Sequence, residues 1–184
     1  MDVLKNAVCA YQDLLGKEHH VCFSNGKEII VVFQPANFIH LAGLRKLTDL
    51  PVLSADHSAI YLYRLIKQGK LTLEEIKCSI HYNSEIHDRI GCISRIGEVM
   101  LSGRAVWDFD GKKARVRTKL KSSVIFFKED NFNFYLTFGV AQGGSHYYPE
   151  TIFYRYDDGY IRGQNIVSVR QVMITDCPKG NQTR

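Results

Sequence analysis

The sequence predicts an α+β fold in which N-terminal helices pack on a C-terminal twisted antiparallel β-sheet. Apolar residues recur at helical spacing in the first half, whereas β-branched and aromatic residues dominate from Arg104 onward. Short turns rich in Gly, Asp and Asn separate the strand-like stretches, as expected for antiparallel hairpins. With 184 residues, 45% hydrophobic and 23% charged, the composition predicts one domain over residues 1–184.

The helices are predicted from apolar periodicity and from the signals at their ends. They are expected at residues 2–15, at about 56–68, in a stretch that begins at 72, and from 83 or 84 to about 103. Gly16 and Gly69 are placed to stop two of these helices, and Thr72 with Glu75 has the form of a capping box. Leu62 is expected to face the core.

The strands follow from turn signals and from alternation. Asn25-Gly26 predicts a hairpin between 21–23 and 29–33, because this pair readily adopts the positive φ angles of a tight turn. Further strands are expected at 122–128, 132–141, 147–156 and 165–175. On one of them Phe132, Phe134 and Phe138 share a face, which we expect to lie in the core.

Several protein classes are excluded by what the sequence lacks. Its apolar runs are far shorter than the ~18 residues of a membrane span, and no secretory signal opens it, so we expect a cytoplasmic protein without membrane contact. The 5 cysteines are scattered and odd in number, which argues against a disulfide framework. Phosphate-loop, dinucleotide-binding, esterase and zinc-protease motifs are all missing. We therefore expect neither a cofactor nor a metal.

Positive charge is concentrated in residues 111–121, which hold six basic and no acidic residues although the whole chain carries only +5. If this segment is extended, alternate side chains share a face. One face then carries Lys113, Arg115, Arg117, Lys119 and Lys121. Successive side chains on this face lie about 6.6 Å apart, twice the ~3.3 Å rise per residue of a β-strand. This distance is similar to that between consecutive phosphates of a single-stranded nucleic acid, which favours RNA binding. The alternative is a solubilising, exposed edge strand.

Tyr135 is a further candidate RNA-binding residue. It shares the polar face of its predicted strand with Asn133 and Thr137, and the next strand adds Thr151 and Arg155. Such a face offers stacking and hydrogen-bonding groups to a nucleotide. A solvated sheet face without a ligand would have the same pattern.

His40 is the single residue that most strongly suggests catalysis. It follows the apolar strand 29–33 and precedes Arg45 and Lys46. A histidine near cations can exchange a proton near neutral pH while the cations hold a phosphate, as attack by a ribose 2′-hydroxyl requires. A structural histidine among apolar neighbours is the alternative.

The motif NFIHLAGL at 37–44, the helix-then-sheet order and the late strand YPETI at 148–152 resemble a known family. This family comprises the prophage-associated nuclease-like domains grouped with barnase, EndoU, colicin E5/D and RelE. The resemblance spans most of the chain. The sequence departs from the family pattern at Ala42, where members often have Thr, and it has Thr151 where Ser is common.

The resemblance implies a metal-independent, toxin-like endoribonuclease of phage or mobile-element origin that cleaves RNA through a 2′,3′-cyclic phosphate. It implies His40 as general base or acid, and Arg45 and Lys119 as cations that stabilise the pentavalent phosphorane. Thr151 would hydrogen-bond a non-bridging oxygen, and His146 is the alternative second proton carrier. RNA and an immunity or antitoxin protein are the implied partners. The hypothesis from another class is a non-catalytic RNA-binding or protein-interaction module on the same scaffold.

Overall fold

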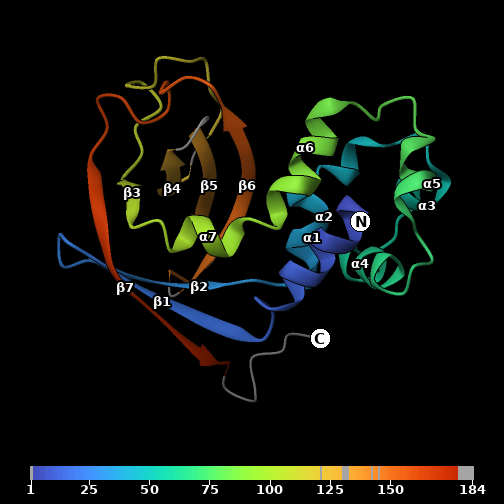
Figure 1. Ribbon diagram of the computed structural model, residues 1–184, viewed down its shortest axis with the longest axis horizontal. Helices are drawn as coiled ribbons and strands as arrows, with labels where there is room; N and C mark the ends of the chain where they lie inside the picture. The colour runs from blue at the N-terminus through green and yellow to red at the C-terminus, as the bar shows by residue number, and fades with distance from the viewer. Residues whose placement is uncertain (1, 121, 130–132, 142, 145, 178–184) are drawn as a thin grey trace.

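A β-barrel and a group of helices lie side by side in the computed structural model (Figure 1), which describes residues 2–120, 122–129, 133–141, 143–144 and 146–177. The helices are α1 Val3–Gln12, α2 Pro35–Leu41, α3 Pro51–Ser54, α4 Ala59–Lys67, α5 Leu73–Lys77, α6 Ser84–Ile93 and α7 Ile96–Met100, with a short 3-10 helix η1 at Leu44–Lys46. The strands are β1 Lys17–Phe23, β2 Glu28–Val32, β3 Arg104–Trp107, β4 Val124–Glu129, β5 Asn133–Val140, β6 Tyr147–Arg155 and β7 Ile166–Asp176. The fold is α+β.

Some helix ends form where the sequence signals place them, but α1 ends at Gln12, before the expected stop at Gly16. Asp2 caps α1 by accepting a hydrogen bond from the Leu4 amide at 2.8 Å. The Thr72 and Glu75 side chains form the capping box that opens α5. The helix expected at about 56–68 is the shorter α4, with Leu62 fully buried.

The stretch expected as one helix from 83 to 103 is instead two helices, α6 and α7. Arg95 leaves the helical region at φ −99° and ψ 1°, and the Ser94 hydroxyl donates to the Gly91 carbonyl at 2.7 Å. Side chains of this kind compete with the helical hydrogen-bond ladder. Helices α2 and α3 were not expected, although Pro35 and Pro51 occupy the first helical positions that favour proline.

The sheet differs from the expected antiparallel one because it closes into a barrel and is mixed. Its strand order is β1-β2-β6-β5-β4-β3-β7, and β7 returns to pair with both β1 and β3. The 11 residues of β7 make this possible, since its first part pairs with β3 and the remainder with β1. The predicted hairpin of β1 and β2 is part of the barrel, and β2 pairs with β6 in parallel.

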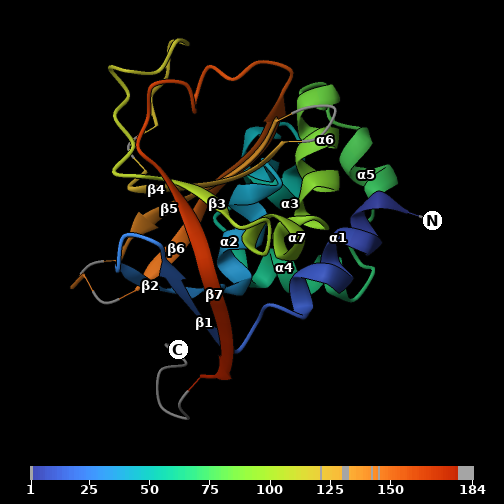
Figure 2. The same cartoon turned by 60° about the vertical axis from the view of Figure 1, so that its left-hand side comes forward.

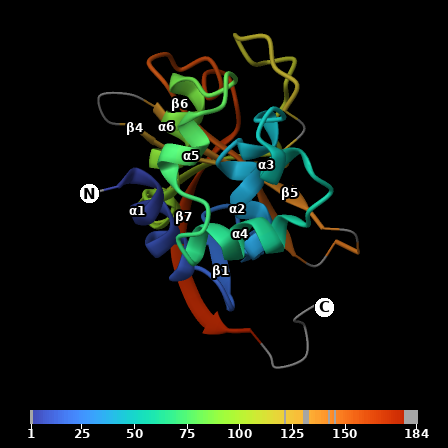
Figure 3. The same cartoon turned by 90° about the vertical axis from the view of Figure 1, so that its right-hand side faces the viewer.

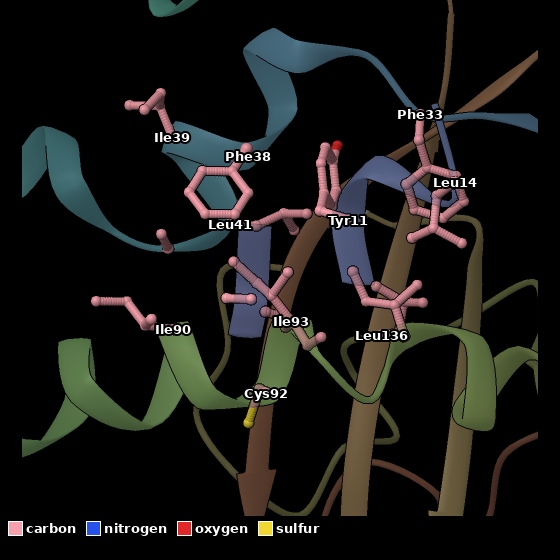
Figure 4. Packing of buried hydrophobic residues seen from close by; sticks show 14 of the residues in the cluster. Tyr11, Leu14, Phe33, Phe38, Ile39, Leu41, Ile90, Cys92, Ile93 and Leu136 are labelled. Carbon is pink, nitrogen blue, oxygen red and sulfur yellow. The ribbon is translucent and has the colours of Figure 1, made fainter. Parts of the chain in front are cut away.

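The main core fills the space between the barrel and the helices. Tyr11 lies at its centre, with its ring centroid 5.3 Å from that of Phe38 and 5.9 Å from that of Phe33 (Figure 4). Its hydroxyl donates to the Gln34 carbonyl at 2.9 Å, so the polar atom of this buried ring is satisfied. Phe134 and Phe138 are buried in this core as predicted, whereas Phe132 lies outside the described residues.

A second, smaller core lies on the other face of the sheet. It is built around Tyr135, Phe127 and Tyr160, with Val116 and Leu120 packed against it. The β3–β4 connection, which includes the basic segment, and the β6–β7 connection lie side by side at this end of the barrel (Figure 2). These two connections place charged residues beside β6.

Candidate active site

Strand β6 provides one wall of the site because most of it has a strand partner on one side only. Along its length it pairs with β5, whereas among the described residues β2 meets it only at the register pair Val31 and Tyr147. Helices α2 and α6 pack against β6 instead (Figure 3). Residues after Tyr147 therefore border a space between the barrel and the helices.

Helix α6 forms the opposite wall with its polar face. Glu85, Asp88, Arg89 and Cys92 are spaced i, i+3, i+4 and i+7, so they lie on one side of the helix. The apolar residues of the same helix point into the main core; they are Ile86, Ile90 and Ile93. Amphipathicity thus directs charged residues toward β6.

The basic segment forms the third wall outside the barrel; it begins with a turn at residues 111–113 and bends at 115–116. Exposure alternates along residues 113–120: the basic residues are exposed, and the residues between them are partly buried. The Arg115 amide donates to the Gly159 carbonyl at 2.9 Å, and Val116 packs so closely on Gly159 that an added Cβ would lie 2.6 Å from it. The expected alternation is confirmed for the described residues; Lys121 lies outside them.

These walls enclose a cleft of about 460 Å³. Its lining residues are Glu85, Arg89, Arg117, Thr118, Lys119, Leu120, Thr151, Phe153, Tyr154, Arg155 and Tyr160. Arg155 is held by the carboxylate of Asp157 at 2.6 Å, and Arg89 lies 3.7 Å from Glu85. Within the described ranges Arg117 and Lys119 form no ion pair, so their charges face the cleft without a neutralising partner.

Arg89 connects the cleft to the end of α2. Its Nε donates to the Leu41 carbonyl at 2.8 Å, and its Nη2 donates to the His40 carbonyl at 3.2 Å and to Thr151 Oγ1 at 3.0 Å. The last carbonyls of a helix lack intrahelical partners, so a guanidinium satisfies them well. Because Thr151 accepts from Arg89, its own hydroxyl proton stays available for another acceptor.

The end of the 37–44 motif makes room for this arginine. Gly43 has a positive φ of 73°, and a Cβ there would lie 3.4 Å from Arg89 Nε. Gly43 therefore both turns the chain after α2 and admits the guanidinium. Ala42, where the sequence departs from the family pattern, is fully buried, so its side chain does not face the cleft.

His40 lies next to this arginine, and its environment keeps the imidazole neutral. Partial burial and then the positive charge of Arg89 lower the pKa of His40, while the Glu150 carboxylate and backbone oppose this shift. Glu150 is held in place by the Ser122 hydroxyl. It also lies at an irregularity in the β5–β6 register, where Gly139 leaves space for its side chain.

The structure places two of the four residues implied as catalytic in the cleft and a third beside it. Lys119 and Thr151 line the cleft, and His40 is joined to it through Arg89. Arg45 lies elsewhere: its Nη2 donates to the His57 carbonyl at 3.0 Å, whereas the next residue, Lys46, reaches Glu85 at 2.7 Å. Successive residues of a 3-10 helix point about 120° apart, which separates these two cations.

His146 also lies away from the cleft, since its Nε2 is 3.7 Å from Glu18 Oε1 on β1. Lys113 and Arg115 are exposed on the basic segment but do not line the cleft. The expectation that Tyr135 lies on a solvated face is wrong. Its ring is fully buried in the second core and stacks on Phe153 at 5.1 Å, so it is closed to a base.

Sequence reasoning missed Arg89 and Glu150. A signal for Arg89 was present, because the polar stripe of the predicted helix from 83 placed it one turn after Glu85. Glu150 stood within the YPETI strand, but only the register irregularity and the packing against Gly139 place it near His40.

Among the described residues, His, Cys, Asp and Glu side chains form no group of three or more that could hold a metal ion, and none of the helices has the length and apolar character of a membrane span.

The cleft combines cations with a threonine hydroxyl, which are groups that can hydrogen-bond a phosphate. Comparison with known families is more specific. The family described as phage-Barnase-EndoU-ColicinE5/D-RelE like nuclease4 matches residues 3–171, and the chain belongs to it. It is thus a phage-associated, nuclease-like domain, as its sequence resemblance implied. No curated protein and no solved structure matches the chain.

Proposed function

We propose that this domain is a metal-independent endoribonuclease that cleaves RNA through a 2′,3′-cyclic phosphate. The observation that carries the proposal is the position of Arg89, which hydrogen-bonds the carbonyl of His40 and the hydroxyl of Thr151 at the edge of a cleft that also contains Lys119. Cations and a hydroxyl donor thus line the cleft, and the residue proposed as proton acceptor, His40, contacts its edge through the bond between its carbonyl and Arg89.

In this mechanism His40 takes the proton of the ribose 2′-hydroxyl. A lowered pKa leaves the imidazole neutral at pH 7, the state that a general base requires. As the imidazole becomes positive, the Glu150 carboxylate stabilises it. Glu150 is thus the negatively charged group beside His40, whereas His146, which directly precedes β6, lies 3.7 Å from Glu18 instead.

The attacking 2′-oxygen displaces the 5′-oxygen of the next nucleotide, which takes a proton from water and leaves as a hydroxyl, and negative charge builds on the phosphorane during this step. Lys119 and the Nη1 group of Arg89 stabilise this charge, and Thr151 donates to a non-bridging oxygen. Fixed charges in a cleft contribute most where charge develops during the reaction. Arg117, together with Lys113 and Arg115 beyond the cleft, holds the adjoining phosphates, and an immunity protein would cover these same cations.

Incubation of the purified chain with single-stranded RNA and with DNA of the same sequence, in excess EDTA, tests the proposal. RNA should be cut and DNA left intact, because only RNA carries the nucleophilic hydroxyl. If the chain binds RNA but cuts it in no buffer, with or without divalent metals, the domain is instead a non-catalytic RNA-binding module. Cleavage that occurs only after a metal is added would contradict the metal-independent mechanism.

A further inference from the structure

A second hollow adjoins the cleft between α6 and β6. It has a volume of about 240 Å³, roughly that of eight liquid waters, and so can hold a single heterocyclic ring system. The hollow and the cleft share Glu85, Arg89, Phe153 and Tyr154. A nucleoside attached to a phosphate in the cleft can therefore place its base in the adjoining hollow.

Apolar surface predominates in the hollow, and its polar lining residues are Ser84, Glu85, Asp88 and Arg89. The aromatic side chains of Phe153 and Tyr154 and the thiol of Cys92 line it, together with Asp88. Asp88 Oδ2 accepts a hydrogen bond from the Tyr154 hydroxyl at 3.0 Å, and this bond fixes the carboxylate in the hollow. Among the described cations none forms an ion pair with Asp88, so its Oδ1 stays open to a ligand.

Glu85, the other carboxylate that lines the hollow, already forms ion pairs with two cations. Lys46 Nζ lies 2.7 Å from Glu85 Oε1, and Arg89 Nη1 lies 3.7 Å from the same atom. Lys46 and Arg89 together hold the pKa of Glu85 below its usual range. Of the two carboxylates in the hollow, Asp88 is thus the one that a ligand can use without breaking an ion pair.

We propose that this hollow is a nucleobase subsite in which the Asp88 carboxylate selects a base with two adjacent N–H donors, which among the four RNA bases is guanine. The subsite proposal rests on the proposed function, because that function places the phosphate of the same nucleotide in the cleft. A carboxylate offers only acceptors. The Watson–Crick edge of guanine presents N1–H and N2–H side by side, whereas uracil, cytosine and adenine each place an acceptor oxygen or nitrogen next to their donor. Phe153 and Tyr154 supply the apolar contact with the ring.

Binding of the four nucleoside 3′-monophosphates, measured by calorimetry on the full chain, tests the subsite without requiring cleavage. The guanosine nucleotide should bind about tenfold or more tightly than the other three, the discrimination of one good bidentate contact. Asp88→Asn should remove this preference, because the amide turns one acceptor into a donor. Glu74→Gln, the same kind of change on the exposed surface of α5, should preserve it.

Tyr154→Phe separates recognition from packing, because it keeps the ring and removes only the hydroxyl that holds Asp88. It should weaken guanosine binding less than Asp88→Asn does and leave the other nucleotides unaffected. Equal binding of all four nucleotides, no binding of any, or an unchanged preference in Asp88→Asn would overturn the subsite while leaving the RNA-cleavage test untouched. A guanosine preference in a chain that never cuts RNA would keep the subsite and refute the nuclease proposal.

Discussion

The residue that organises the site is Arg89, because it satisfies acceptors from two separate elements at once. Its guanidinium closes the end of α2 at Leu41 and His40 and reaches Thr151 on β6. His40 and Thr151 were identified from the sequence because they stand in motifs. Arg89 was not, since its role depends on contacts 48 to 62 residues away along the chain.

At this scale the first prediction concerns the proton acceptor. His40→Ala should lower the single-turnover rate of RNA cleavage about 10²–10⁴-fold, the usual contribution of a positioned base. Affinity and thermal stability should stay near wild type because the side chain is exposed and its carbonyl, which contacts Arg89, is retained. Loss of folding in this variant would instead support a structural histidine.

The second prediction is the pH dependence of kcat/KM. Activity should rise as His40 loses its proton, and because burial and Arg89 lower the pKa of His40, the midpoint of this acidic limb should lie below 6.5. Glu150→Gln removes a charge that favours the imidazolium, so it should shift the limb to still lower pH. A shift to higher pH would show that Glu150 does not act on His40.

Among the helices and strands, the sequence predicted the features that depend on residues close together in the chain. The capping box of α5 and the β1–β2 hairpin depend on neighbouring residues and were predictable. The alternation of the basic segment was also predictable, but its docking on the β6–β7 connection was not. That docking depends on Val116 meeting Gly159 across the second core.

The third prediction tests the basic segment as a phosphate track. If Lys113, Arg115, Arg117 and Lys119 all contact phosphates, log K for non-cleavable 2′-O-methyl RNA should fall with log salt at a slope of about −2.8, from ~0.7 per contact. Arg115→Glu with Arg117→Glu should reduce the magnitude of the slope by about 1.4. Lys67→Glu with Lys70→Glu, an equal charge change among the helices, should leave it near wild type; a flat wild-type profile would exclude the track.

The fourth prediction concerns α4. Leu62→Ala should lower the free energy of unfolding by about 2–5 kcal/mol, because it leaves a cavity in the main core. Ile60→Ala, on a residue 43% exposed in the same helix, should cost about 0.5 kcal/mol or less. Chemical denaturation measures both, and equal effects would mean that the two faces of the helix are wrongly assigned.

For the molecule as a whole, the fold class followed from the sequence but the closure of the barrel did not. Closure requires β7 to pair with β1, more than a hundred residues earlier, and no local pattern encodes a partner so distant. The cleft also depends on long-range contacts, since β6, α6 and the two connections meet only in the folded chain. Separate motifs therefore suggested the chemistry, and the fold places two of the four implied residues in one cleft, with His40 bonded to Arg89 at its edge.

The central claim, that this cleft cleaves RNA by attack of the neighbouring 2′-hydroxyl, is tested most directly with one modified oligonucleotide. After the cut site of a short RNA has been mapped in EDTA, the 2′-hydroxyl on the 5′ side of that bond is replaced by hydrogen. Cleavage at this bond should stop while other sites are still cut, and the unmodified RNA should yield fragments ending in 2′,3′-cyclic phosphate. Continued cleavage at the deoxy position, or fragments ending in a 3′-hydroxyl, would contradict the claim.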